Sequence, residues 1–132
     1  MFSKKNLSEV KFERALHRDG TAAPDLIDVI LQNYSTCEVL FGASMSRETL
    51  EETIQTGFAV LYSKSRKSRW KKGEGSGDLL QVMEVFLNCD KNQLLVRVIP
   101  LGAGICHEKD ERGIAKATCF SRLVVKQKIR GR

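Results

Sequence analysis

LIDVILQNYSTCEVLFGA, at residues 26–43, carries the clearest structural signal in this chain of 132 residues. Its first half is rich in β-branched residues, and apolar side chains alternate over residues 27–31, which predicts a strand. Residues 35–37 (STC) supply the short polar side chains of a turn, and residues 38–43 (EVLFGA) resemble a returning strand. The segment therefore predicts a β-hairpin.

Helix and strand signals alternate further along the chain. Ser46 suits a helix N-cap, Leu50 and Ile54 lie four residues apart on one helical face, and Gly57 ends the helix. The segment 78–87 (DLLQVMEVFL) fits a helix or a strand, and its second half favours a strand. Strands are also predicted at residues 58–62, 93–99 and 118–125, a hairpin turn at 88–92, and a short helix at 7–16. The pattern predicts a strand-rich α+β fold with one or two helices.

Composition indicates one soluble globular domain, with 42% hydrophobic and 29% charged residues. We assign residues 1–24 to a polar N-terminal leader, 25–125 to the domain and 126–132 to a basic tail. No apolar run approaches the roughly 20 residues that a membrane-spanning helix needs. The N-terminus lacks the apolar region of a secretory signal, so no membrane association and a cytoplasmic location are expected.

Much of the net charge of +6 comes from the basic segment, residues 63–77 (SKSRKSRWKKGEGSG). It holds six cations, which a hydrophobic core cannot accommodate unpaired, so the segment must lie on the surface. Its charge predicts a phosphate-bearing partner, either a polynucleotide or a small nucleotide. Nucleic acid is the less favoured partner, because single-strand binders usually offer several aromatic side chains and this segment has only Trp70.

Three cysteines stand out, in a predicted tight turn (Cys89), after a glycine-containing loop (Cys106) and at the start of a predicted strand (Cys119). His107 directly follows Cys106. Cys89, Cys106 and Cys119 could together hold a catalytic zinc with an open fourth position. Their spacing matches no standard zinc motif, and on spacing alone we favour unrelated buried thiols. Both interpretations stay open at this point.

Several segments together resemble the phosphoribosyl-AMP cyclohydrolase family of histidine biosynthesis. The resemblance runs over roughly residues 24–122 and is most specific in the basic segment. It is carried by QNYSTCEVLFGASMSRETL (32–50), LYSKSRKSRWKKGEGSG (61–77), NCDKNQLL (88–95), GICH (104–107) and Cys119-Phe120. It implies a mainly antiparallel sheet and an intertwined homodimer.

The resemblance also implies a reaction. Zinc held by Cys89, Cys106 and Cys119, drawn from both chains of the dimer, would activate a water that breaks the N1–C6 bond of the purine of phosphoribosyl-AMP. His107 would assist proton transfer, and Glu74 would be either a catalytic or substrate ligand or a salt-bridge partner. Trp70 would stack on the nucleotide or pack at the base of the segment. The residues assigned to phosphate or ribose are Arg66, Lys72, Ser63, Ser65 and Ser76.

The chain departs from the family pattern in the turn at residues 88–92, which marks it as a divergent member. Where the family has three aspartates that indicate a magnesium site, only Asp90 remains, between Asn88 and Asn92. Magnesium favours carboxylate oxygens, so we predict that its binding is weak or lost. Two alternatives to a zinc hydrolase of phosphoribosyl-AMP or a related purine nucleotide therefore remain. One is a non-catalytic relative that binds nucleotide and zinc, and the less favoured one is a nucleic-acid-binding module.

Overall fold

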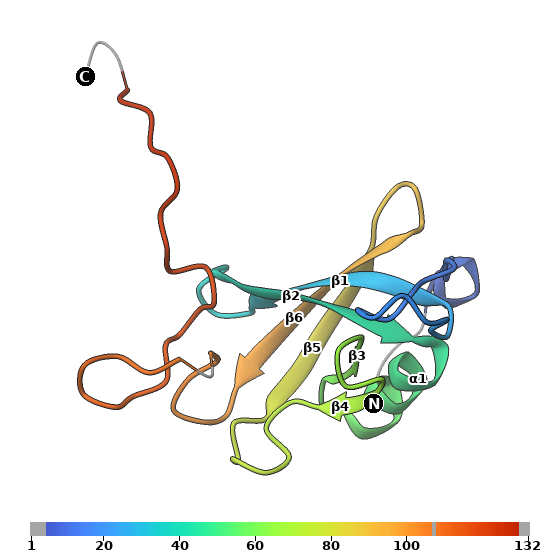
Figure 1. Cartoon of the computed structure of the whole chain (residues 1–132), viewed down its shortest axis with the longest axis horizontal. Helices are drawn as coiled ribbons and strands as arrows, with labels where there is room; N and C mark the ends of the chain where they lie inside the picture. Colours follow the sequence, from blue (N-terminus) through green and yellow to red (C-terminus); the bar gives the residue numbers. More distant parts are fainter. Residues whose placement is uncertain (1–4, 107, 130–132) are drawn as a thin grey trace.

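A six-stranded sheet curls around the hydrophobic core in this computed structural model, which describes residues 5–106 and 108–129 (Figure 1). The strand order is β4-β3-β2-β1-β6-β5. The elements are β1 (Leu26–Asn33), β2 (Val39–Ser46), α1 (Arg47–Thr56), β3 (Val60–Ser63), β4 (Ser68–Lys71), β5 (Leu80–Leu87) and β6 (Gln93–Pro100). In this described part, β1 and β6 pair in parallel and every other strand pair is antiparallel. The prediction of a mainly antiparallel, strand-rich α+β fold is thus confirmed, and the β1–β6 pairing makes the sheet mixed.

The predicted hairpin is the pair β1–β2. Alternate side chains of β1 point into the core, with Ile27, Val29 and Leu31 all at most 2% exposed. The Asn33 side chain accepts a hydrogen bond from the Ser35 N–H (2.8 Å) and so stabilises the turn. Strand β2 continues to Ser46, three residues beyond the predicted end, because it pairs with the whole of β1.

Helix α1 begins and ends where its capping residues predict. The Thr49 N–H donates to Ser46 Oγ (3.2 Å) and the Ser46 N–H donates to Thr49 Oγ1 (2.9 Å), which is a reciprocal capping box. Gly57 ends the helix in the left-handed region at φ 82°, where a Cβ would be strained. Leu50 is buried and Ile54 packs against the core, so the helix covers one side of β2 and β3.

The curl of the sheet arises because the chain before β3 bonds to β5. Phe58 bridges to Gln81, the Ala59 N–H donates to the Leu80 carbonyl (3.0 Å), and the Val82 N–H donates to the Gly57 carbonyl (2.8 Å). These bonds connect two distant parts of the six-stranded order and enclose the apolar interior. The side chains that are fully buried there include Leu31, Leu40, Met45, Leu61, Leu80, Val96 and Val98.

Two sequence predictions for the termini are wrong. Only Leu7–Glu9 forms a short 3-10 helix within the predicted helix 7–16, because the Lys11 N–H donates to the Lys91 carbonyl (2.8 Å) and Glu13 bridges to Leu26. The predicted last strand at 118–125 is an exposed extended segment (Figure 1). Its apolar residues favour a strand locally, but a strand needs a hydrogen-bonded neighbour. No described strand pairs with it.

Two interpretations of the middle of the chain are refined. The basic segment is a β-hairpin rather than one long loop, because residues 68–71 form β4 and pair with β3. The ambiguous stretch 78–87 is a strand over Leu80–Leu87, which pairs along β6. The search for membrane-spanning helices among the described residues found none of sufficient length and hydropathy.

Candidate active site

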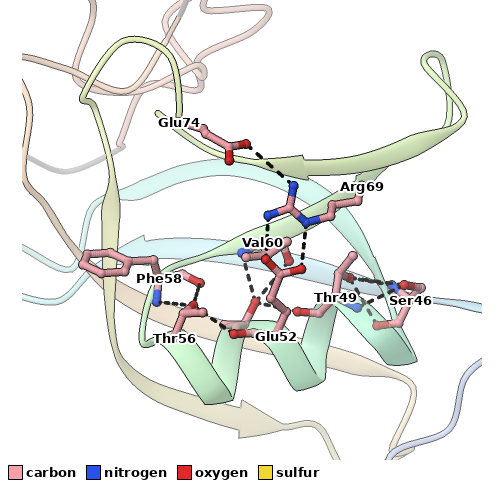
Figure 2. Close-up of polar contacts among 9 residues, drawn as sticks. Ser46, Thr49, Glu52, Thr56, Phe58, Val60, Arg69 and Glu74 are labelled. Carbon is pink, nitrogen blue, oxygen red and sulfur yellow. Dashed lines mark hydrogen bonds and ion pairs between the residues drawn. The ribbon is translucent and has the colours of Figure 1, made fainter.

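The β3–β4 hairpin is fixed to the body of the protein by Arg69. Its guanidinium donates two hydrogen bonds to the Glu52 carboxylate of α1, at 2.7 and 2.6 Å (Figure 2). Glu74 makes a longer ion pair with the same guanidinium, at 3.7 Å. The hydrogen bond from Arg69 is the main cause that lowers the pKa of Glu52. Glu74 therefore has the contact of a salt-bridge partner, and its catalytic or substrate-binding role stays a prediction.

Protein groups already hold four of the six cations of the basic segment. Their contacts are Arg69 with Glu52, Lys67 with Asp19 (2.5 Å), Arg66 over the Trp70 ring (5.8 Å) and Lys71 over the Phe58 ring (5.4 Å). Lys64 and Lys72 have no ion pair or ring contact within the described residues. Lys64 lines a surface hollow, and Lys72 acts electrostatically on Cys119. The segment is thus a folded hairpin with two available cations rather than a uniform positive surface.

The hollow has a volume of about 460 Å³ and lies between the hairpin and the sheet. It brings together three residues predicted to bind substrate, Ser63, Ser65 and Trp70. Ser63 Oγ lies 3.2 Å from Ser65 Oγ and accepts a hydrogen bond from the Arg66 N–H (3.1 Å). Trp70 also packs on Phe41 of the core, with ring centroids 6.4 Å apart. The structure therefore gives Trp70 a packing role and a place in the wall of the hollow.

Cys106 and Cys119 meet at the end of the sheet where β6 leaves it. The Ile105 and Cys106 N–H groups both donate to the Lys116 carbonyl (2.8 and 2.9 Å), and the Cys119 N–H donates to the Leu40 carbonyl (2.8 Å). Gly104 permits this fold of the chain, because a Cβ there would lie 2.2 Å from the Ala115 carbonyl oxygen. Burial and a hydrogen bond with the Cys106 thiol raise the pKa of the Cys119 thiol to about 11.

Cys89 lies at the opposite end of the β5–β6 hairpin, in the turn before β6. Strand β6 has eight residues, which span about 23 Å at the usual rise of a strand. Within residues 5–106 and 108–129, no three His, Cys, Asp or Glu side chains come together as a metal site. The predicted zinc ligands are therefore divided in a single chain, two at one end and one at the other. His107, the predicted proton-transfer residue, lies outside the described residues.

The residues matched in the family comparison include both ends of the sheet. The family model of phosphoribosyl-AMP cyclohydrolase matches residues 41–121, which include the basic segment and all three candidate zinc ligands. The chain belongs to the phosphoribosyl-AMP cyclohydrolase family. The sequence-based assignment to this family of histidine-biosynthesis enzymes is confirmed.

Individual cyclohydrolases show the same relationship. The phosphoribosyl-AMP cyclohydrolase of Solibacter usitatus is 36% identical over 107 residues, which cover 81% of this chain and 80% of the relative. That of Ralstonia nicotianae is 46% identical over 82 residues, 62% of this chain and 59% of the relative. The histidine biosynthesis bifunctional protein of Thermus thermophilus is 40% identical over 100 residues, 76% of this chain and 44% of that longer protein.

In this member of the cyclohydrolase family, the side chains of Asn88 and Asn92 form a hydrogen bond with each other. Asn88 Nδ2 donates to Asn92 Oδ1 (2.9 Å), and Asn88 Oδ1 accepts from the N–H groups of Asn92 (2.9 Å) and Gln93 (3.0 Å). Both side chains thus stabilise the turn, whereas Asp90 is exposed. Their oxygens are engaged within the protein, and weak or lost magnesium binding stays a prediction.

The other predicted site residues divide between the hairpin and the turn that follows it. Ser76 Oγ accepts from the Asp78 N–H (3.3 Å) in an exposed turn, and Arg66 lies over Trp70. Sequence reasoning missed three charged residues that line the hollow, which are Arg18, Asp28 and Lys64. It assigned the phosphate to Arg66 and Lys72 instead of Lys64. The signal for Asp28 was an acidic side chain on the outward face of an otherwise apolar strand, whereas nothing local indicated Arg18.

Proposed function

We propose that the protein is a zinc-dependent phosphoribosyl-AMP cyclohydrolase that opens the purine ring at the N1–C6 bond and acts as a homodimer. The observation that carries this proposal is the division of the three candidate ligands. Cys106 and Cys119 are adjacent, and Cys89 lies at the far end of the same strand pair. A second copy placed in the opposite direction would bring its Cys89 to the Cys106–Cys119 pair, and two such sites would form.

The donor set fits zinc. The thiol of the buried Cys106 hydrogen-bonds with that of Cys119 and disfavours its ionisation, and a divalent cation would replace both protons. Cysteine sulfur is a preferred zinc ligand, and three protein ligands leave one position open for water. When bound, such a zinc supplies a water whose pKa falls to about 7, so that hydroxide is available at neutral pH.

The position of the hollow supports the same arrangement. Gln93 lines the hollow and directly follows the turn that carries Cys89, so the hollow and Cys89 lie at the same end of the sheet. A partner that completes the zinc site with Cys89 would therefore place the metal near Ser63, Ser65 and Lys64. These side chains offer hydroxyl and ammonium donors to a phosphate group. The purine would then extend from the hollow toward the metal.

Other residues have roles that follow from their places. Lys72 lies close enough to Cys119 to favour its thiolate form, so it stands beside the Cys106–Cys119 pair of its own chain and does not line the hollow of that chain. His107 follows Cys106 directly in the sequence, and we assign to it the transfer of a proton during ring opening. Trp70 keeps the hairpin on the core through Phe41 and presents part of its surface to the ligand.

A relative that binds nucleotide and zinc without turnover is the second candidate. The observation that favours it is the bonded pair Asn88–Asn92 in the turn beside Cys89. Zinc binding by thiolates does not need these residues, so binding could persist where the reaction has been lost.

The test is to incubate zinc-loaded protein with phosphoribosyl-AMP and to follow the ultraviolet change of ring opening. We expect turnover and one zinc per chain in the wild type, and loss of both in Cys106→Ser. Cys37→Ser is the matched control, because Cys37 is exposed in the β1–β2 turn, and it should retain both. Bound zinc and nucleotide without turnover would select the non-catalytic relative.

A further inference from the structure

The N-terminal segment, residues 13–23, contributes Arg18 to the wall of the hollow described above. It bridges to β1 through Glu13 and Leu26 and folds on itself through Leu16 and Ala22. Arg18 stands in the turn that the Leu16–Ala22 bridge closes, and it lines the hollow together with Lys64, Ser63 and Ser65. This segment lies outside residues 41–121, the part that the family model matches.

Several contacts hold the segment against the basic hairpin. The Arg18 N–H donates to the Lys64 carbonyl (3.3 Å), which places the backbones of the two cations side by side. His17 Nε2 lies 2.8 Å from the Tyr62 hydroxyl, and the two rings stack with centroids 5.9 Å apart. Asp19 pairs with Lys67 on the other side of Arg18. The position of Arg18 beside Lys64 is therefore determined by bonds on both sides.

The charged residues around Arg18 leave its guanidinium available to bind a ligand. The neighbouring carboxylate, Asp19, is already bound to Lys67 and to the Thr21 hydroxyl (2.6 Å). Arg18 itself is exposed and has no ion pair among the described residues. Two cations and the hydroxyls of Ser63 and Ser65 thus line one hollow. An arginine fork with an ammonium group is a suitable donor set for a phosphate.

The floor of the hollow has the opposite charge. Asp28 lies on β1, in register with Ser44 of β2 and Gln93 of β6, and its side chain is exposed toward the hollow. A carboxylate accepts hydrogen bonds from neighbouring hydroxyls and is a common partner of ribose hydroxyls in nucleotide sites. The hollow thus combines donors for a phosphate with an acceptor for a sugar. Its volume falls within the range of small-molecule sites.

We infer that Arg18 and Lys64 bind the phosphate of a phosphoribosyl group and that Asp28 binds its ribose hydroxyls. The N-terminal segment is then part of the substrate site, and His17 and Tyr62 are positioning residues that hold Arg18 in place. This inference rests on the proposed function for the identity of the substrate. The binding of a sugar phosphate in the hollow can nevertheless be measured without any turnover.

Trp70 provides the readout, because it is the only tryptophan of the chain and lines the hollow. Full-length zinc-loaded protein is titrated with ribose 5-phosphate while tryptophan fluorescence is recorded, and inorganic phosphate is titrated separately. We expect saturable binding of both probes. Arg18→Ala should weaken both by about 10- to 100-fold, as for the loss of a charge-assisted phosphate contact.

Two variants serve as controls. Arg14→Ala removes the same charge from the same segment, but Arg14 lines a different, smaller depression, so affinity should change by less than about twofold. Asp28→Asn should weaken ribose 5-phosphate and leave inorganic phosphate unchanged or slightly tighter. This difference separates recognition of the sugar from a general attraction for anions.

The inference is overturned if the wild type gives no fluorescence response to ribose 5-phosphate, or if Arg18→Ala binds it as tightly as Arg14→Ala does. Turnover of phosphoribosyl-AMP with an unchanged KM in Arg18→Ala would overturn this inference and leave the proposed function standing. Tight, Arg18-dependent binding of ribose 5-phosphate by a protein that does not turn over phosphoribosyl-AMP would leave the inference standing and remove the proposed function.

Discussion

Arg69 of β4 holds Glu52 of α1 through two hydrogen bonds of 2.7 and 2.6 Å. Strand β4 is an edge strand that pairs only with β3 among the described strands, so its other attachments are this contact and the packing of Trp70 on Phe41. The hairpin carries Ser63, Ser65 and Trp70 into the hollow. The order of the substrate site therefore depends on an ion pair that itself lies outside the hollow.

Glu52→Gln should loosen the hairpin while the core remains intact. The amide can accept only one of the two bonds, and the charge that attracts Arg69 is lost. We expect faster hydrogen exchange of the β4 amides, with the β1 amides unchanged. Glu51→Gln removes the same charge from the neighbouring exposed position of α1 and should leave both strands unchanged. Equal exchange in the two variants would contradict this role of Glu52.

Thr53→Val should destabilise the whole protein by about 1–3 kcal/mol, because a buried N–H loses its acceptor. The Thr53 hydroxyl is fully buried and accepts from the Val60 N–H (2.9 Å), and methyl groups cannot replace that bond. Thr56→Val is the matched control on the same helix. Its hydroxyl is exposed, water can take its place, and the cost should stay below about 1 kcal/mol. Urea unfolding of the two variants provides the comparison.

Asp19 should titrate well below an ordinary aspartate. Hydrogen bonds from Lys67, and then from Thr21, lower its pKa from 3.8 to about 2. Because the folded state has the lower pKa, the contribution of this pair to stability is present above pH 3.8 and is lost as the pH falls toward 2. An NMR titration of the Asp19 carboxyl should show a midpoint near 2 in the wild type. In Lys67→Ala the midpoint should rise toward 3.8, and an unchanged midpoint would show that Lys67 is not the cause.

Replacing both Asn88 and Asn92 by aspartate should create a magnesium dependence. Asn88 donates to Asn92 in the wild type, whereas two carboxylates at these positions would repel each other unless a cation lay between them. We expect calorimetry to detect magnesium binding in the double variant and none at micromolar concentration in the wild type. Magnesium should also raise the melting temperature of the variant alone. Micromolar binding by the wild type would show that the asparagines do not prevent the site.

The parts of the fold that could be predicted from sequence depend on local signals. The β1–β2 hairpin follows from alternation and a polar turn, and α1 follows from Ser46 and Gly57, whose capping roles need only neighbouring residues. The prediction of a last strand at 118–125 is wrong because it rested on a local signal alone. Its local pattern is that of a strand, but pairing depends on a neighbour that the described chain does not supply.

The candidate site could be predicted as a set of residue types but not as an arrangement. The basic segment was recognised as a surface feature. The sequence could not show which of its cations form ion pairs, because Asp19 and Glu52 reach it from distant parts of the chain. The parallel pairing of β1 with β6 is also a long-range contact without a local signal. Arg18 was missed for the same reason, since it reaches the hollow only through the fold of the N-terminal segment.

The central claim, a zinc site shared between two chains, is tested most directly in a mixed dimer. Cys89→Ser and Cys106→Ser chains carrying different tags are co-expressed, and the mixed species is purified through both tags. In the shared arrangement one site has two substituted ligands and the other keeps Cys89, Cys106 and Cys119 intact. We therefore predict about one zinc per mixed dimer and about half of the wild-type turnover of phosphoribosyl-AMP, whereas each variant alone has neither. A mixed dimer with no zinc and no turnover would contradict the account.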